Sequence, residues 1–235
     1  MARMDILHIG NKNYSSWSLR PWVLMRELGI PFEERLHVFG PGFKAKGGFG
    51  SPSGKVPCLH SGKRVLWDSM GIAEFLAESH PGVWPGDADA RAWARCAAAE
   101  MHSGFFALRE VCSMNCGIRV KLHTHSDALV RDLDRLAELW QDGLARFGGP
   151  FLAGKAFTAV DAFFCPVAFR VQTYGLELPK PAMEYVQRLL ALPSMQRWYA
   201  EGLAEPYRDT PHEDEIGHAG VIVKDLRSAA PTVTA

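Results

Sequence analysis

The sequence predicts an α/β domain followed by an all-helical domain, and three observations lead to this fold class. Residues 1–80 alternate short apolar runs typical of strands with segments whose apolar residues recur at helical spacing. A stretch rich in proline and glycine, residues 81–87, then indicates a linker between domains. Residues 88–205 show helical periodicity only, while residues 206–235 lose clear periodicity and are expected to form a C-terminal extension.

The first domain is expected to consist of a strand–helix–strand unit, a long loop, a hairpin and a final helix. Alternating apolar residues indicate the strands, apolar residues three and four apart indicate the helices, and six glycines indicate the loop. The expected elements are a strand at 4–9, a helix at 17–29, a strand at 32–39, the loop at 40–54, hairpin strands at 56–60 and 64–67, and a helix at 70–80. Long loops inside compact domains tend to be functional.

The second domain is expected to be a bundle. Its helices are predicted at 88–111, 126–147, 162–171, 183–192 and 193–203. Thr158 and Asp161 precede the third of these helices at the spacing of a capping box, so we interpret both as structural residues. Because residues 162–171 are apolar nearly all round, this helix is expected at the centre of the domain.

Composition and charge exclude several classes of protein. The chain has 235 residues, of which 47% are hydrophobic, and can bury a substantial core. Lys and Arg total 26, as do Asp and Glu, so the net charge favours neither a nucleic-acid partner nor an anionic membrane. No apolar run approaches the length of a membrane span, and the first residues lack a signal-peptide core.

The cysteines predict a reducing environment. There are five, an odd number, and no CxxC motif is present, which argues against a disulfide framework. Cys112 and Cys116 lie four residues apart, but no second Cys/His pair at zinc-site spacing accompanies them, so no metal is expected.

Two of the expected helices begin with polar residues directly after a strand. Ser15 and Ser16 precede the first helix, and Asp68 and Ser69 precede the helix at 70–80. Such residues serve as N-caps, but a helix N-terminus with free backbone N–H groups also binds anions. Because ligands of open α/β sheets lie outside the carboxyl ends of strands, the two turns could converge on one small ligand with carboxylates.

Five short motifs follow one another along the chain. They are Ser15-Ser16-Trp17-Ser18-Leu19-Arg20, Ser51-Pro52-Ser53-Gly54-Lys55-Val56-Pro57, Asp68-Ser69, the Trp-Pro pair of the linker, and Phe157-Thr158-Ala159-Val160-Asp161. With these motifs the chain resembles the glutathione S-transferase superfamily over residues 4–205. The resemblance implies a thioredoxin-like N-terminal domain that binds glutathione and an all-helical domain that supplies the pocket for a second substrate. It also implies a homodimer in the cytoplasm with a role in detoxification.

The first motif is most similar to the serine-type classes, and in particular to the zeta (maleylacetoacetate isomerase) pattern Ser-Ser-Cys-Ser-x-Arg. Trp17 stands where that pattern has cysteine, which argues against zeta-class isomerase activity. The resemblance therefore implies a glutathione transferase that activates the glutathione thiol as a thiolate for attack on a small electrophile. Two alternatives stay open: a zeta-like glutathione-dependent cis-trans isomerase, and a non-catalytic glutathione-binding or regulatory protein on the same fold.

The resemblance assigns the contact with the glutathione thiol to Ser15 or Ser16. A serine hydroxyl that donates a hydrogen bond to the sulfur favours the thiolate, and the dipole of the helix that follows adds to this effect. We favour Ser15 as the donor, with Ser16 as a cap or a second ligand contact. Tyr14 is a rival donor, because other classes of the superfamily use tyrosine.

The resemblance also implies the remaining glutathione contacts. Lys55 is placed to meet a carboxylate. The backbone of Val56, which precedes a candidate cis Pro57, would pair with the cysteinyl residue as an added strand does. Asp68 would hold the ammonium of the γ-glutamyl end, and Ser69 with its helix N-terminus would hold the carboxylate there.

The pocket for the electrophile is expected on the first helix of the second domain, which lines the cleft in this family. Met101, Phe105 and Arg109 are the candidates for its wall. His102 lies among them and is interpreted as a helix residue rather than a catalyst. An isomerase with a dianionic substrate would require a basic pocket, and only Arg109 and Arg119 hint at one.

Overall fold

A four-stranded sheet forms the N-terminal half of the molecule, with its strands in the order β2–β1–β3–β4. The computed structural model describes residues 4–40, 43 and 49–229, so part of the loop expected at 40–54 lies outside the described residues. The elements of this half are β1 (Asp5–Gly10), α1 (Ser16–Glu27), β2 (Phe32–His37), β3 (Cys58–Ser61), β4 (Arg64–Trp67) and α3 (Ser69–Ala77). β1 runs parallel to β2 and antiparallel to β3.

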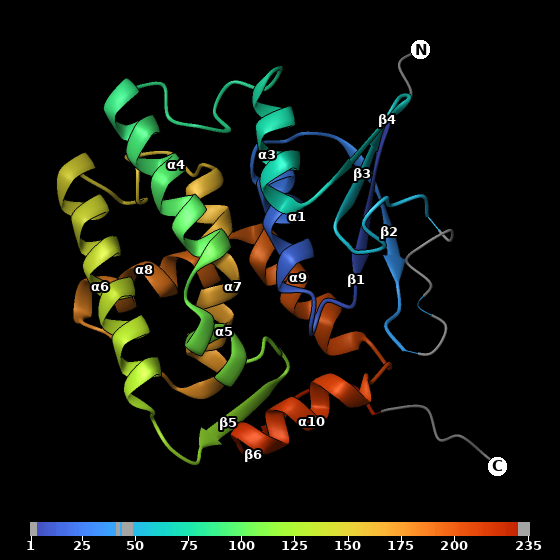
Figure 1. Ribbon diagram of the computed structural model, residues 1–235, viewed down its shortest axis with the longest axis vertical. Helices are drawn as coiled ribbons and strands as arrows, with labels where there is room; N and C mark the ends of the chain where they lie inside the picture. Colours follow the sequence, from blue (N-terminus) through green and yellow to red (C-terminus); the bar gives the residue numbers. More distant parts are fainter. Residues whose placement is uncertain (1–3, 41–42, 44–48, 230–235) are drawn as a thin grey trace.

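Helices α1 and α3 lie between the sheet and the helical half of the molecule (Figure 1). Side chains two residues apart in a strand share a face, so Leu7 and Ile9 of β1 enter the core together and are fully buried. Leu19 and Val23, four residues apart in α1, belong to the same core cluster. The apolar faces of β1 and α1 therefore pack into the same hydrophobic core.

Seven helices form the other half of the described chain. They are α4 (Ala88–Ser103), α5 (Phe106–Val111), α6 (Asp127–Phe147), α7 (Ala159–Tyr174), α8 (Lys180–Leu190), α9 (Pro193–Ala204) and α10 (Thr210–Ala219). α7 is buried along nearly its whole length and packs against α1, α4 and α8. The apolar run that predicted a central helix is thus found at the centre, and the predicted fold class is confirmed.

The single helix expected at 88–111 is in fact two helices. α4 ends at Ser103, Gly104 has extended backbone, and Phe105 adopts a left-handed conformation with φ of +52° before α5 begins. Glycine is a weak helix former, and a Cβ at Gly104 would lie only 2.8 Å from the carbonyl oxygen of Glu100. Apolar periodicity continues through this break, which is why the pattern alone predicts one helix.

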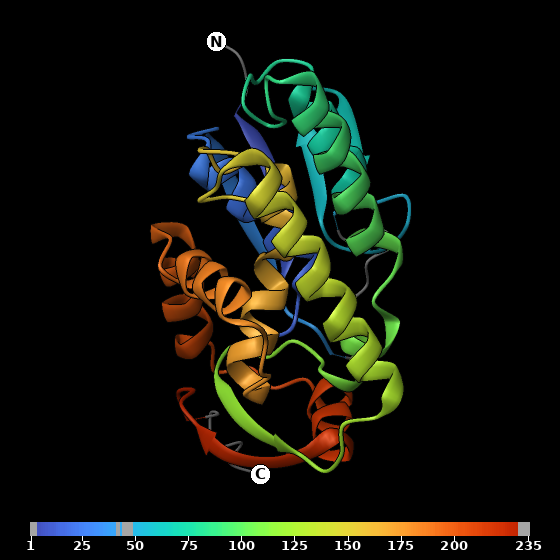
Figure 2. The same ribbon diagram turned by 90° about the vertical axis from the view of Figure 1, so that its left-hand side faces the viewer.

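A two-stranded ribbon, which the sequence analysis does not predict, lies at one end of the helical half. β5 (Ile118–Leu122) pairs antiparallel with β6 (Gly220–Asp225), which directly follows α10. Figures 1 and 2 show the ribbon and α10 together near the C-terminus. Residues in the extension expected at 206–235 thus form a helix and a strand. The strand escapes prediction because its partner is remote in sequence and strand propensity depends on such context.

Three further properties concern membrane spans, cysteines and metal ligands. No helix in the described part of the chain is long and apolar enough to cross a membrane. The five cysteines are free thiols; Cys96 is exposed and the other four are buried. Over residues 4–40, 43 and 49–229, no group of three or more His, Cys, Asp or Glu side chains is arranged to hold a metal ion.

Asp161 anchors the start of α7. One of its carboxylate oxygens accepts hydrogen bonds from the backbone N–H of Leu152 (3.0 Å) and the hydroxyl of Tyr185 (2.8 Å). The other accepts from the backbone N–H of Thr158 (2.9 Å), within the capping box that the sequence predicts. The side chain is completely buried, so its partners could not turn to water instead.

Replacing Asp161 with alanine should lower the free energy of unfolding by about 3 kcal/mol, because buried donors lose their acceptor. Urea denaturation of the purified protein measures this loss. Asp134→Ala, on an exposed position of α6, is the matched control and should change stability by about 0.5 kcal/mol at most. Equal small losses in both variants would contradict the anchoring role of Asp161.

Candidate functional site

Three segments of the first half meet at one edge of the sheet. The pairing register places Cys58 of β3 opposite His8 of β1 and opposite Trp67 of β4. Because β3 runs antiparallel to both neighbours, the residues that precede it lie beside the residues that follow β1 and β4. The segments brought together in this way are 11–16, 55–57 and 68–69.

A cavity of about 460 Å³ opens at this edge, and we call it the first cavity. Its wall consists of Trp17, Ser53, Lys55, Val56, Pro57, Trp67, Asp68, Ser69 and Arg109. All the residues between positions 55 and 69 that the sequence analysis singles out as ligand contacts line it. Ser53 and the exposed Trp67 are additions: Ser53 lies within one of the five motifs, and Trp67 directly precedes another. The size is suited to a small molecule.

Ser69 has a hydroxyl that no residue in the described part of the chain satisfies, although the side chain is only 1% exposed. Buried hydroxyl groups are nearly always hydrogen-bonded, so this one is available to a ligand. Asp68 precedes it as the N-cap of α3 and accepts a hydrogen bond from the backbone N–H of Met70 (2.8 Å). Asp68 also adopts φ of +72°, a region that residues other than glycine rarely occupy and that recurs at ligand sites.

The segment before β3 brings a cation and unused backbone groups to the same wall. Lys55 is exposed and forms no ion pair with a carboxylate of the described residues. The Val56–Pro57 peptide bond is cis, as the sequence predicts. Within the described chain, neither the N–H nor the C=O of Val56 has a hydrogen-bond partner. These groups can therefore engage a ligand that carries an anion and a peptide backbone.

Ser15 and Ser16 differ in what their hydroxyl groups contact. Ser15 is the N-cap of α1, and its hydroxyl donates to that of Ser18 (2.7 Å), which in turn accepts from the backbone N–H of Gly10 (3.1 Å). Ser16 lies instead in the wall of a second cavity of about 320 Å³. Neither serine lines the first cavity, but the adjacent Trp17 lines both cavities.

The second cavity lies between the start of α1 and the helical half. Its wall consists of Tyr14, Ser16, Trp17, Phe106, Arg109, Glu110, Ser113, Met114, Arg170 and His212. Arg109 and Trp17 are common to both cavities, so the two spaces adjoin. Arg170 and His212 come from α7 and α10, which the sequence analysis did not connect with a site. Arg170 stands in an apolar helix and gives no signal in the sequence.

Of the three residues predicted for the wall of the electrophile pocket, Arg109 lines both cavities, whereas Met101 and Phe105 are buried in the core and line neither. Met101 lies within α4, and Phe105 lies at the break after α4, where its left-handed conformation redirects the chain into α5. A role of these two residues in the pocket stays a prediction. Arg119 lies on β5, where its guanidinium donates to the carbonyl of Ile118 (2.7 Å), away from both cavities.

His102 lies beside the first cavity without lining it. Its Nε2 is 3.5 Å from a carboxylate oxygen of Asp68, and its ring meets the edge of the Trp17 ring at 5.1 Å between centroids. Burial lowers the pKa of His102, against the opposing charge of Asp68. The interpretation of His102 as a helix residue rather than a catalyst stays a prediction.

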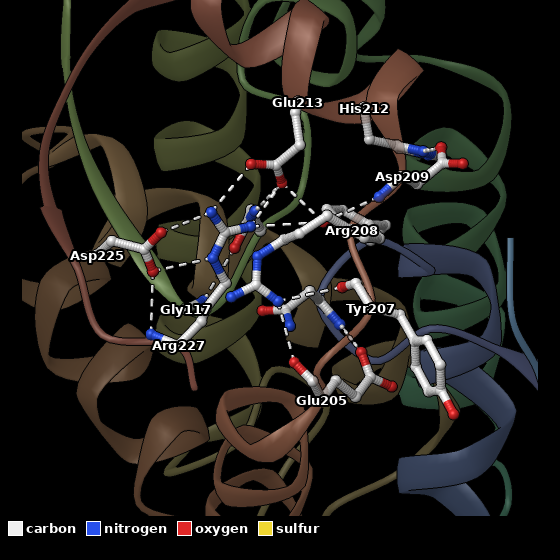
Figure 3. Close-up of polar contacts among 12 residues, drawn as sticks. Gly117, Glu205, Tyr207, Arg208, Asp209, His212, Glu213, Asp225 and Arg227 are labelled. Atoms are coloured by element: carbon white, nitrogen blue, oxygen red, sulfur yellow. Dashed lines mark hydrogen bonds and ion pairs between the residues drawn. The ribbon is translucent and has the colours of Figure 1, made fainter. Parts of the chain in front are cut away.

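Tyr14 is held by the C-terminal extension. Its hydroxyl donates to a carboxylate oxygen of Glu213 on α10 (2.7 Å). Arg227 pairs with both oxygens of Glu213 (2.5 and 2.9 Å) and with Asp225 (2.7 Å), as Figure 3 shows. Burial, together with the hydrogen bond to Glu213, raises the pKa of Tyr14 above its ordinary value. Because the Tyr14 proton is already committed to Glu213, this phenol is poorly placed to donate to a thiol.

Comparison with known proteins identifies both halves of the chain. Residues 14–79 match the family model of the glutathione S-transferase N-terminal domain, and residues 122–201 match that of the glutathione S-transferase C-terminal domain. A search of curated proteins finds no match.

Solved structures with the same fold cover almost the whole chain. A glutathione transferase homolog from Burkholderia gl BGR1 with bound glutathione is 24% identical, with a TM-score of 0.64 over 85% of this chain and 98% of that one. The theta class glutathione S-transferase of the citrus canker pathogen Xanthomonas axonopodis pv. citri, with glutathione bound, is 23% identical, with a TM-score of 0.59 over 85% and 98%. Glutathione transferase Omega 3C from Trametes versicolor is 16% identical, with a TM-score of 0.62 over 93% and 94%.

Replacing Arg227 with glutamine should loosen the C-terminal extension, because Glu213 and Asp225 would lose their shared cation. We expect amide hydrogen exchange in residues 210–225 to rise roughly tenfold, while exchange in α7 stays unchanged. Mass spectrometry of the intact and digested protein measures both regions. Arg131→Gln, at an exposed position of α6, is the control. Unchanged exchange in residues 210–225 would show that the Arg227 pairs do not hold the extension.

Proposed function

On the premise that the chain belongs to the glutathione S-transferase superfamily, we propose that it is a glutathione transferase that attacks a small electrophile with the glutathione thiolate. The buried, unpaired hydroxyl of Ser69 in the wall of the first cavity is the observation that carries the proposal. It lies at the N-terminus of α3, where backbone N–H groups favour an anion such as the γ-glutamyl carboxylate. Nothing in the described fold uses that hydroxyl, so a ligand is the remaining partner.

The other parts of glutathione find complementary groups in the same wall. Asp68 offers a carboxylate for the γ-glutamyl ammonium, and the free N–H and C=O of Val56 offer a strand-like pairing for the cysteinyl residue. The ammonium of Lys55, which has no carboxylate partner in the described chain, offers a site for the remaining carboxylate. The cysteinyl sulfur would then be directed toward the start of α1 and the second cavity.

Activation of the thiol requires only a donor and a favourable potential. A cysteine thiol has an ordinary pKa of about 8.5, and lowering it by two units takes about 2.7 kcal/mol. A hydrogen bond to the thiolate and the N-terminus of α1 can supply an energy of this size. The serine acts as a donor, so no general base is needed beside it.

Ser16 is the better supported of the two serine donors. Its side chain lines the second cavity, and among the described residues no hydrogen bond is formed by its hydroxyl, in contrast to that of Ser15. The hydroxyl of Ser15 is 2.7 Å from that of Ser18 and donates to it. We therefore assign the thiol contact to Ser16, and to Ser15 the shaping of the turn before α1. This reverses the preference that the sequence motif suggests and is open to a direct test.

Glutathione binding measured by calorimetry tests the function itself. Ser69→Ala should weaken the affinity for glutathione roughly tenfold or more, because a hydrogen bond to a charged group is lost. Ser79→Ala, an exposed serine that follows α3, should bind glutathione as the unmodified protein does. If the unmodified protein does not bind glutathione, the transferase proposal is wrong. If Ser69→Ala binds as tightly as the control, the placement of the γ-glutamyl end is wrong.

The pKa of the thiol of bound glutathione distinguishes the roles of the two serines. It is measured from the ultraviolet absorbance of the thiolate as a function of pH. Ser16→Ala should return that pKa toward about 8.5 and lower kcat/KM roughly 100-fold, the usual cost of a donor lost from an anionic transition state. Ser15→Ala should move the pKa less, since Ser15 donates to Ser18. The opposite order of effects would assign the thiol to Ser15. No effect of either substitution would exclude both serines.

A further inference from the structure

Two guanidinium groups lie over the ring of Trp17, and a third, that of Arg170, is close enough to add to burial in lowering the pKa of Arg20, against the opposing charge of Asp68. The guanidinium carbon of Arg20 lies 4.1 Å from the centroid of the Trp17 ring, and that of Arg109 lies 4.7 Å from the same ring. Arg170 reaches this region from α7 and donates through Nη1 to the carbonyls of Arg109 (3.3 Å) and Cys112. Within residues 4–40, 43 and 49–229, none of the three arginines forms an ion pair with an acidic side chain.

Such an arrangement is costly, because buried charges are normally paired. Arg170 is only 5% exposed, and its Nε has no partner in the described chain; Arg20 is 2% exposed, and its Nε and Nη1 also have none. Burial and the neighbouring arginines lower the pKa of Arg20 to about 9. Burial lowers the pKa of Arg170 to about 10. Both side chains therefore remain cationic at neutral pH, where their charges repel one another and that of Arg109.

The second cavity is the space that can relieve this repulsion. Arg109 and Arg170 stand in its wall together with the hydroxyl-bearing Ser113. The acidic residue of the wall is Glu110, which is exposed to solvent, whereas Arg170 is buried. Glu215 is near enough for its charge to favour the cationic form of Arg170, but it accepts a hydrogen bond from Ser113 (2.9 Å) instead.

We infer that the second cavity takes an electrophile that carries a carboxylate or a similar oxyanion. Arg170 and Arg109 bind the anion, and the rings of Trp17 and Phe106 pack against the apolar part of the molecule. This inference rests on the proposed function, because the thiolate must reach the electrophile from the first cavity. Trp17 and Arg109 line both cavities and so mark the place where the two substrates meet.

Glutathione itself is not the anion that the arginines require. In the proposed pose its two carboxylates are met by Lys55 and by Ser69 at the N-terminus of α3, on the wall of the first cavity. Arg170 lines only the second cavity. Glutathione and the second substrate therefore draw on different cations, and a substitution at Arg170 separates their effects.

The test compares 4-chloro-3-nitrobenzoate with its methyl ester. In both, the glutathione sulfur forms a bond to the ring carbon and chloride leaves with the electron pair. The ester group activates the ring more strongly than the carboxylate, so each kcat/KM is divided by the rate constant of the uncatalysed reaction of the same compound with glutathione. With this correction, the unmodified protein should have a higher kcat/KM for the acid than for the ester. In Arg170→Gln the ratio of the two kcat/KM values should fall roughly tenfold or more, through KM for the acid. Arg170→Lys should retain part of the ratio, because it keeps the charge.

Arg119→Gln is the matched control, because Arg119 also donates to backbone carbonyls but lines neither cavity. Its ratio should equal that of the unmodified protein. The thermal midpoint and KM for glutathione of each variant establish that the fold and the first cavity are intact. If Arg170→Gln fails to fold, Arg170→Lys and Arg109→Gln provide the same comparison.

Several outcomes would overturn the inference while leaving the transferase function standing. The first is a ratio that favours the ester in the unmodified protein. The second is a ratio that does not change in folded Arg170 variants. The third is a rise in KM for glutathione in these variants without a fall in the ratio. If neither compound reacts, calorimetry measures the binding of unreactive 3-nitrobenzoate to the glutathione complex. Binding to the unmodified protein that is lost in Arg170→Gln supports the inference. No binding to the unmodified protein, or equal binding to both proteins, overturns it. A protein that does not bind glutathione at all would instead refute the proposed function.

Discussion

The turn that carries the candidate serines is held in shape by carboxylates from elsewhere in the chain. The backbone N–H of Lys12 donates to one oxygen of Glu205 (2.7 Å), and that of Asn13 donates to the other (3.3 Å). The ammonium of Lys12 is buried and pairs with Glu34 and Glu201. Breaking a buried ion pair is expensive because one charge is left without a partner. The turn between β1 and α1 therefore depends on α9 and the residues that follow it, and the positions of Ser16 and Trp17 at the start of α1 depend on this turn.

This dependence explains why a site on the sheet edge needs the helical half. The register of the sheet brings the segments around Val56 and Asp68 together, and Arg109 of α5 completes the wall of the first cavity from the helical half. The turn beside them is fixed by the second half, where the indole N–H of Trp198 donates to the carbonyl of Lys12 (2.8 Å) and Glu213 accepts a hydrogen bond from the Tyr14 hydroxyl (2.7 Å). A ligand between the two cavities would thus contact groups whose positions are set by both halves of the chain.

Local patterns predict the strands and most helices, because the residues of one element lie next to one another in the sequence. Asp68 and Ser69 were identifiable as polar residues between a strand and a helix, and the register then placed them in the cavity wall. The remaining features depend on distant contacts. The ribbon joins strands that are far apart in the sequence, and Arg170 resembles a core position in an apolar helix. The break between α4 and α5 was not predicted, because apolar spacing continues through it.

Trp17 connects these observations, because it is where the sequence departs from the pattern that it most resembles. A cysteine at this position would be small and polarisable, whereas the indole forms part of both cavity walls. Its electron-rich faces attract the guanidinium groups of Arg20 and Arg109, and this attraction offsets part of the cost of burying unpaired cations. With cysteine at the same place, the arginines would lack that support. Trp17 therefore supports Arg109, which with Arg170 brings positive charge to the wall of the second cavity.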